Sequence, residues 1–491
     1  MANDKPNILL IMADQMAFDV IGALGHPVVQ TPNLDRLADN GAIFGNCYCN
    51  SPLCTPSRAS FMTGTYVRNN MVFDNGAELT ASHPTLMHHL NVAGYDTILA
   101  GKMHFVGPDQ LHGFTERLTT DIYPADFGWS PDWSLGVCFN DGTGMKKLKR
   151  SGECKWNDQM AYDEGVLYAT LSKIRDMGAN KSDKPFFLCA SFTHPHDPFL
   201  MTKEFLALYE KSAIPLPNAP AANYSDMHPY NQWIQKHHGN DTCEITEEDI
   251  INSRRAYYAM VTYFDHMVGA ITNELERMGL SDNTLIAITS DHGEMLGEHG
   301  MWFKRTFYDH SAKVPLIISW PGNIKHGAKI DEVVSLVDLT ATFMEIGQVN
   351  ERGIWANDMD GDSLVPLLTG NGGQWKNEAL CEYYGEGPIH SMFMYRRGIY
   401  KYVYVHKHEP LLFDLERDPH ETINLAREPA YAHICRELHE AAASGWDGDE
   451  MDSMVLESQR KRKLINQSMS ASGKNDYGWD YIPINNKIPI D

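Results

Sequence analysis

Short apolar runs alternate with helix-like stretches along the first two thirds of this sequence. The helix-like stretches include a Thr31-Pro32 helix start and residues 247–278, which carry apolar side chains at helical spacing. The apolar runs resemble strands that are buried on both faces of a parallel sheet, and they lie at residues 7–13, 97–100, 186–192, 285–289 and 314–320. The alternation predicts an α/β fold in which helices flank a mostly parallel sheet.

A different pattern begins near residue 375. Residues 392–405 are rich in Tyr, Met and Val, and an apolar run at 411–414 follows a Glu-Pro turn. Short aromatic and β-branched runs joined by turns are typical of hairpins. This part of the chain therefore predicts a small antiparallel sheet.

The last part of the chain is polar after residue 465 but carries the aromatic residues Tyr477, Trp479 and Tyr481. Because disordered segments are poor in aromatic residues, we expect this tail to dock on another surface. The expected organisation is a catalytic α/β domain at 1–375, a C-terminal subdomain with the small sheet and a helix at 376–465, and an extended tail at 466–491.

The charge of the chain argues against a nucleic-acid partner. Its 491 residues include 41 Lys and Arg against 64 Asp and Glu, which gives a formal net charge of −23. The two short basic runs, at 146–150 and 460–463, are too small for a nucleic-acid footprint, and we read them as solvated faces.

Cysteine usage and the apolar segments predict the compartment. The nine cysteines include no CxxC pair, which argues against a disulfide framework or a structural zinc site. The N-terminus lacks the long apolar region of a signal peptide, and no segment approaches the ~18 apolar residues of a membrane-spanning helix. We therefore expect a soluble, cytoplasmic protein without a membrane partner.

Polar residues follow four of the apolar runs directly, at 14–15, 101–104, 193–197 and 291–293. Ligands of open α/β sheets bind beyond the carboxyl ends of the strands, so we expect these residues to meet at one site. Potential metal ligands among them are Asp14, Gln15, Asp291 and His292. Their donors suit a hard divalent cation, calcium first and manganese or magnesium next. The alternative is structural, with an aspartate capping a helix and the histidine serving as a hydrogen-bonding residue.

The segment Cys54-Thr55-Pro56-Ser57-Arg58 has the pattern of a helix start, with Thr55 as the cap and Pro56 in the first turn. Helix N-terminal N–H groups bind anions, and the Arg58 guanidinium suits sulfate or phosphate oxygens. A nucleophile at Cys54 would face a tetrahedral anion. A thiolate phosphatase is one alternative, but such enzymes place a Gly-rich loop around the cysteine, and this segment has no glycine before Gly64.

This motif resembles the maturation signature of the type I sulfatases of the alkaline-phosphatase-like superfamily. The resemblance implies that a formylglycine-generating or equivalent enzyme oxidises Cys54 to formylglycine (3-oxoalanine), which also binds the divalent metal. One geminal hydroxyl of the hydrated aldehyde would attack sulfur, and the other would later expel sulfate.

Other residues resemble active-site positions of the same family. By this resemblance, Lys102, Lys304 and Arg58 would neutralise the sulfate oxygens. His104 would hold the formylglycine hydroxyl, and His196 would protonate the leaving oxygen.

The metal positions depart from most sulfatases, which have Asp-Asp and Asp-Asn-Gly where this chain has Asp14-Gln15 and Asp291-His292-Gly293. Residues 101–129 are similar to the choline-sulfatases, which share the Gln and His variants. This second resemblance implies hydrolysis of choline sulfate, a small sulfate ester, to choline and sulfate.

Choline carries a quaternary ammonium group, which proteins recognise with aromatic faces and a carboxylate because it cannot donate a hydrogen bond. By the resemblance, Trp129 would hold this group together with Asp480, which would come from the tail of a neighbouring subunit. A site shared in this way implies a homo-oligomer, either dimer or tetramer. The expected substrate-binding set is completed by Asn75, Tyr123 and His194.

Two alternatives remain open. An arylsulfatase or a phosphonate or phosphate monoester hydrolase could use the same scaffold, because sulfuryl and phosphoryl centres are similar tetrahedral anions. A catalytically silent binding protein for choline-like osmolytes would keep Cys54 unmodified.

Overall fold

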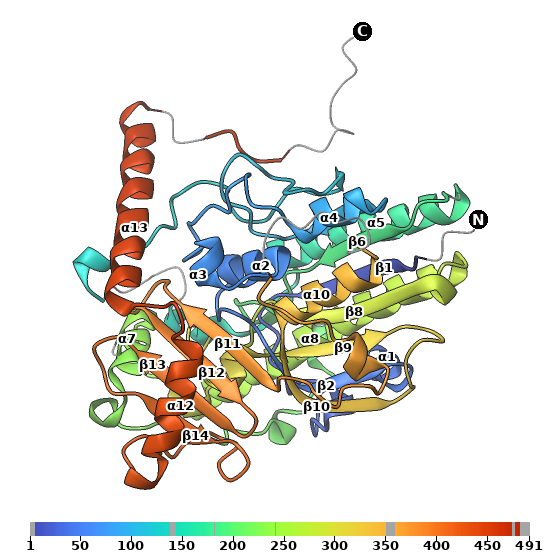
Figure 1. Ribbon diagram of the computed structural model, residues 1–491. Helices are drawn as coiled ribbons and strands as arrows, with labels where there is room; N and C mark the ends of the chain where they lie inside the picture. The colour runs from blue at the N-terminus through green and yellow to red at the C-terminus, as the bar shows by residue number, and fades with distance from the viewer. Residues whose placement is uncertain are drawn as a thin grey trace.

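The computed structural model describes residues 5–137, 144–180, 182–240, 242–349, 359–473 and 477–481. An eight-stranded sheet with the order β10-β2-β9-β8-β1-β6-β3-β4 forms the centre of the larger domain (Figure 1). Its strands are β1 (Asn7–Ala13), β2 (Ala42–Tyr48), β3 (Asp96–Gly101), β4 (Glu116–Arg117), β6 (Phe186–Ser191), β8 (Thr284–Ser290), β9 (Lys313–Ser319) and β10 (Ala328–Ser335).

Helices cover both faces of this sheet, which confirms the predicted α/β architecture. Alternate residues of β1 enter two separate cores, Leu10 on one face and Leu9 on the other, which explains its continuously apolar sequence. One face packs against α2 (Cys54–Thr63), α4 (Leu86–Val92) and α10 (Leu336–Ile346). The other packs against α1 (Pro32–Asp39), α5 (Asp158–Ala179) and α8 (Glu247–Arg277).

Four of the five apolar runs become the adjacent parallel strands β8, β1, β6 and β3. Their carboxyl ends therefore meet at one edge, as expected. The fifth run, β9, differs because it is antiparallel to both β8 and β2. The loop 291–312 returns the chain to the sheet at the edge where β8 ends, and burial on both faces gives β9 the same apolar sequence as a parallel strand.

The predicted C-terminal antiparallel sheet is confirmed. It consists of β11 (Glu378–Tyr383), β12 (Met392–Arg397), β13 (Tyr400–Val405) and β14 (Leu411–Asp414), with α12 (Ala432–Ala442) packed against it (Figure 1). Asn50, which lies four residues before Cys54, joins the two sheets. Its carbonyl accepts from the N–H of Glu382 at 2.9 Å, and its amide donates to the carbonyl of Leu380 at 3.0 Å.

The last helix, α13 (Gly448–Ala471), runs through residue 465, so the expected start of the tail falls inside a helix. In Figure 1 this helix projects beyond the small sheet. Beyond it, the rings of Tyr477 and Trp479 contact Phe127, and the ring of Tyr481 lies against the Arg117 guanidinium. These contacts place the described part of the tail beside the loop that follows β4.

The remaining short elements connect these parts. They are α3 (Val67–Asn70), α6 (Lys203–Leu206), α7 (Pro229–His238), α9 (Asp309–Ala312), α11 (Val365–Leu368), β5 (Gly152–Glu153) and β7 (Leu200–Met201). Within the described ranges, no helix has both the length and the apolar character needed to cross a membrane.

Candidate active site

Cys54 is the first residue of α2 and is almost completely buried. The helix begins two residues earlier than expected, since Leu53 and not Thr55 occupies the capping position. The carboxamide oxygen of Asn75 instead accepts from the N–H of Thr55 at 3.0 Å and so satisfies a donor of the first turn. The arrangement holds the Cys54 side chain at the N-terminal end of a helix, where negative charge is stabilised.

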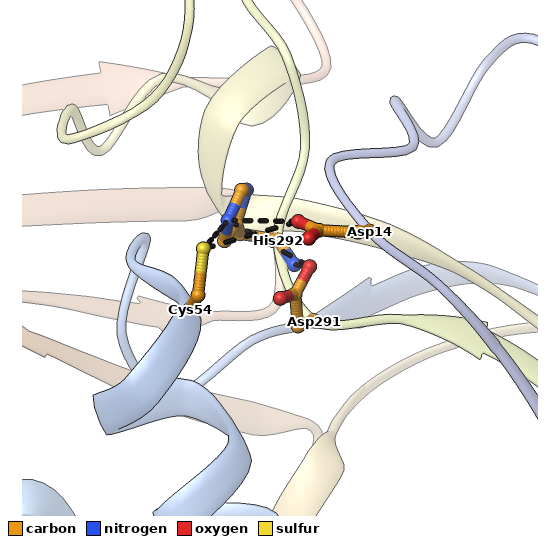
Figure 2. A group of neighbouring side chains, drawn as sticks. All are labelled: Asp14, Cys54, Asp291 and His292. Carbon is orange, nitrogen blue, oxygen red and sulfur yellow. Dashed lines mark hydrogen bonds and ion pairs between the residues drawn. The ribbon is translucent and has the colours of Figure 1, made fainter. Parts of the chain in front are cut away.

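Three side chains from two strand ends, Asp14 after β1 and Asp291 and His292 after β8, converge on Cys54 at the start of this helix (Figure 2). The ligand atoms of Asp14, Cys54, Asp291 and His292 all lie within 4.8 Å of one another. Nε2 of His292 lies 3.2 Å from the Cys54 sulfur and 3.7 Å from a carboxylate oxygen of each aspartate. Ligands that surround one divalent ion at about 2.0–2.6 Å have this spacing, and two carboxylates with an imidazole are suitable donors. The residues therefore fit a divalent metal.

Gln15 lies beside this cluster with its backbone at φ 65°. Its N–H donates to Asp291 at 3.1 Å, its carboxamide oxygen accepts from Lys304 at 2.5 Å, and its amide nitrogen donates to Glu294 at 2.6 Å. The proposed ligand oxygen of Gln15 is thus bonded to an ammonium group in this structure.

Cations surround the thiol of Cys54. Nζ of Lys304 lies 3.5 Å from its sulfur, and Nζ of Lys102 donates to Asp14. Burial alone would raise the pKa of Cys54, but Lys102 and Lys304 outweigh burial and hold that pKa well below its usual value. The site therefore stabilises negative charge at this position.

Arg58 lies behind the cluster and outside the cavity lining described below. Its Nε donates to Asp291 at 2.9 Å, and its Nη1 donates to the carbonyl of Lys102 at 2.7 Å and to the hydroxyl of Ser191 at 2.8 Å. Burial opposes ionisation of Asp291, but Arg58, His292 and Lys102 together outweigh burial and lower the pKa of Asp291 to about 2. Arg58 thus holds the ionised carboxylate of Asp291 in place and joins three strand ends.

The loop after β3 depends on Gly101, whose φ is +104° and where a Cβ atom would collide with the carbonyl of Ser191. This close approach carries His104 to the cavity, where burial lowers the pKa of its imidazole. His196 reaches the cavity from the loop after β6. Its Nδ1 lies 2.7 Å from the carbonyl of Asp197.

A cavity of about 600 Å³ opens beside Cys54. Its lining includes most of the expected catalytic and substrate-binding residues, namely Cys54, Asn75, His104, Tyr123, Trp129, His196 and Lys304. The Tyr123 and Trp129 rings contact each other at 4.9 Å between centroids, and Trp133 adds a third aromatic wall residue. These aromatic residues reach the cationic groups directly, since Nζ of Lys102 lies 4.3 Å from the centroid of the Tyr123 ring.

Two expected substrate contacts lie outside this lining. His194 is completely buried, and its Nδ1 lies 2.6 Å from a carboxylate oxygen of Asp163, which also accepts from the N–H groups of Thr193 and His194. His194 therefore holds the loop that carries His196. Asp480, which is among the described residues, is exposed and does not line the cavity of its own chain.

Glu386, which is not among the predicted site residues, lines the cavity from the loop after β11. Its Oε1 lies 3.6 Å from Arg305, and its buried Oε2 has no hydrogen-bond partner in the described part of the chain. Burial raises the pKa of Glu386, against the opposing charge of Arg305. The Gly385-Glu386-Gly387 sequence directly after an aromatic strand was the available signal, since glycines permit a carboxylate to turn into a site.

Comparison with known proteins places this geometry in a family. The Sulfatase family model matches residues 6–349, and the model named N-sulphoglucosamine sulphohydrolase, C-terminal, matches residues 297–444. The chain is 40% identical to the choline-sulfatase of Rhizobium meliloti (strain 1021), with 99% of this chain and 95% of the relative covered. It is 29% identical to the arylsulfatase of Clostridium perfringens (strain 13 / Type A), with 87% and 91% covered.

A solved structure shows the same fold. The phosphonate monoester hydrolase of Agrobacterium radiobacter superposes with a TM-score of 0.74 at 28% identity, covering 89% of this chain and 94% of that one. The matches therefore extend over both sheets and not only over the motif around Cys54. This chain belongs to the sulfatase family and is a sulfuric ester hydrolase with the alkaline-phosphatase-like fold.

Proposed function

We propose that this enzyme hydrolyses choline sulfate to choline and sulfate. The observation that carries the proposal is the mixed lining of the cavity, which combines cationic, aromatic and carboxylate side chains. Lys304 lies 3.5 Å from the Cys54 sulfur, and Trp129, Trp133 and the incompletely bonded Glu386 also line the cavity. Choline sulfate is a zwitterion whose anionic and cationic groups are separated by two methylenes, so each group would find its complement. The 40% identity to a choline-sulfatase supports the same substrate.

The recognition of the cationic end follows from its chemistry. A trimethylammonium group offers no hydrogen-bond donor, and an aromatic face stabilises it through the ring quadrupole. Trp129 and Tyr123 supply such faces, and Glu386 supplies a carboxylate whose raised pKa a nearby cation would lower again. We therefore add Glu386 to the substrate-binding residues.

The sulfate end would be held by the cationic residues. Lys304 lines the cavity and would contact the sulfate oxygens, while Lys102 and Arg58 would act mainly through Asp14 and Asp291, to which they are bonded. His104 would orient the nucleophile.

The family implies a divalent metal and a formylglycine, and we propose both for this chain, with calcium as the metal. Asp14, Asp291 and His292 would hold the ion together with the modified side chain at position 54, and Gln15 would join them once its oxygen is released by Lys304. A bound divalent cation supplies Lewis acidity at the sulfate oxygens. A formylglycine supplies a hydrated aldehyde as nucleophile.

Protonation of the leaving oxygen would fall to His196. Its Nδ1 faces a carbonyl, so its Nε2 points toward Lys304 and the cavity. An alkoxide is a poor leaving group, and a proton donated at this oxygen as the bond breaks would lower the barrier.

We further propose a cytoplasmic homo-oligomer whose tail carries Asp480 to a neighbouring cavity, and maturation by a separate formylglycine-generating enzyme. Every cysteine in the described ranges is unpaired, which agrees with a reducing compartment.

An aryl sulfate or phosphonate monoester is the second candidate substrate, favoured by the similarity to the arylsulfatase and to the phosphonate monoester hydrolase. The deciding experiment compares kcat/KM for choline sulfate, 4-nitrophenyl sulfate and a phenyl phosphonate ester, with enzyme whose formylglycine content is known. We expect choline sulfate to give the highest value. A higher kcat/KM for either aryl ester would contradict the proposal.

A further inference from the structure

One carboxylate outside the cavity lining holds two segments of the active site. Oδ2 of Asp121 accepts from the N–H groups of Met103 at 2.9 Å and His104 at 2.8 Å. Its Oδ1 accepts from the N–H groups of Ile122 at 2.9 Å and Tyr123 at 3.2 Å. The first segment carries His104. The second carries Tyr123, which forms the aromatic wall of the cavity together with Trp129 and Trp133.

The first of these segments needs such support. His104 has φ 58°, a left-handed backbone conformation that is unfavourable for a side chain with a Cβ atom. Its N–H is held by Asp121, and the preceding Lys102 is held through the N–H that donates to Ser191 at 3.0 Å. The direction of the His104 imidazole therefore depends on these two anchors.

The charge of Asp121 suits this task. Its side chain is 6% exposed, and Nη2 of Arg117 donates to its Oδ2 at 3.2 Å. Burial alone would raise the pKa of Asp121, but Arg117 and His104, together with the backbone N–H donors, outweigh burial and lower this pKa. The ionised group presents acceptors on both oxygens, whereas an asparagine amide has an acceptor on one side only.

The two segments meet in the cavity. The His104 ring lies 4.8 Å from the Tyr123 ring and 5.3 Å from the Trp129 ring, measured between centroids. A displacement of either segment would therefore change both the catalytic imidazole and the surface proposed to bind the cation.

We propose that Asp121 is a positioning residue that fixes the catalytic loop and the aromatic wall relative to each other. The inference rests on the proposed function for the catalytic role of His104 and for the expected effect on substrate selectivity. Asp121 acts through His104 and Tyr123 and contacts no substrate.

The test uses Asp121→Asn with Asp109→Asn as the matched control. Asp109 lies in the same stretch of chain and accepts from the N–H groups of Leu111 and His112, both at 3.0 Å, but neither lines the cavity. For each variant, kcat and KM are measured on choline sulfate and 4-nitrophenyl sulfate and corrected for folded fraction and formylglycine content.

We expect Asp121→Asn to lower kcat on both substrates by about a hundredfold, the usual cost of a misplaced catalytic group. KM should rise for choline sulfate and stay within about twofold for 4-nitrophenyl sulfate, because only the first uses the aromatic wall. Asp109→Asn should leave all four constants within about twofold.

Unchanged kcat on both substrates, or equal effects of the two variants, would overturn the inference. If Asp121→Asn does not fold, Asp121→Glu, which keeps both acceptor oxygens, should show a smaller change of the same kind. Failure of both to fold would make Asp121 a folding residue and would also overturn it. Poor turnover of choline sulfate by the wild-type enzyme would refute only the proposed function, since the expected kcat loss on 4-nitrophenyl sulfate would stand.

Discussion

Nζ of Lys304 lies 2.7 Å from Nε2 of His196. Since Nδ1 of His196 faces the carbonyl of Asp197, which can only accept, the imidazole carries its proton on Nδ1 and accepts from Lys304 through Nε2. Nζ of Lys304 and Nε2 of His196 therefore share one proton, and both side chains line the cavity. This pair is therefore suited to deliver a proton to a leaving oxygen.

The first prediction is that His196→Gln affects substrates according to their leaving groups. General acid catalysis contributes roughly 10²–10⁴-fold to a rate, and an alkoxide needs it more than a nitrophenolate. We expect kcat for choline sulfate to fall by about a hundredfold or more, and kcat for 4-nitrophenyl sulfate to fall much less. Equal losses, measured by steady-state kinetics, would show that His196 binds sulfate instead of protonating the alcohol.

A second prediction concerns the nucleophile. Cys54→Ala should give a folded protein without measurable turnover, because no other side chain can supply the hydrated aldehyde. Cys154→Ala is the control, since that cysteine is partly exposed and is not part of the cavity lining. Mass spectrometry of the Cys54 peptide should show conversion in active wild-type protein. Residual activity within tenfold of wild type would refute covalent catalysis at this position.

The third prediction concerns the metal. Asp14→Asn removes one formal charge from the ligand cluster, so bound calcium measured by elemental analysis should fall together with activity. Chelation of the wild-type enzyme should also abolish turnover, and calcium should restore it. Active wild-type protein without any divalent ion would show that the ligand assignment is wrong.

A fourth prediction concerns selectivity at the aromatic wall. A desolvated cation–π contact contributes about 2 kcal/mol, so Trp129→Ala should lower kcat/KM for choline sulfate by roughly thirtyfold. Glu386→Gln should lower it in the same direction and leave 4-nitrophenyl sulfate nearly unaffected. Trp156→Ala is the matched control, because Trp156 is exposed and lies outside the cavity lining. Equal losses of kcat/KM on both substrates would show that these residues stabilise the fold and do not bind the cation.

The fifth prediction concerns the tail. Removal of residues 474–491 keeps α13 complete and should lower kcat/KM for choline sulfate selectively, as should Asp480→Asn. Because Asp480 does not line the cavity of its own chain, mixed oligomers of Asp480→Asn and Cys54→Ala subunits should regain activity. No gain in activity from mixing, or an unchanged kcat/KM after truncation, would exclude the tail from the cavity.

Much of this site could be predicted because it depends on strand ends. Asp14, His196 and Asp291 each follow a buried apolar run, and parallel strands bring such residues to one edge whatever their distance in sequence. The orientation of β9 could not be predicted in the same way, because an antiparallel strand buried on both faces has the same composition as a parallel one.

Residues that reach the site from other parts of the fold were harder to predict. Glu386 follows a strand of the small sheet, and nothing in the local sequence indicates which surface that loop faces. Conversely, His194 has the same local setting as His196 but is turned away by its bonds to Asp163. Such differences arise from tertiary packing, which single-sequence patterns do not record.

The joining of the two sheets at Asn50 has a consequence for how enzymes of this kind diverge. The groups that cleave the ester sit on the large sheet, whereas Glu386 enters from a short loop of the small one. If Glu386 binds the alcohol as proposed, exchange of that loop would change which alcohol is accepted and leave the cleavage machinery intact. New substrate preferences can therefore arise through a few substitutions between residues 384 and 388, without reinvention of the chemistry.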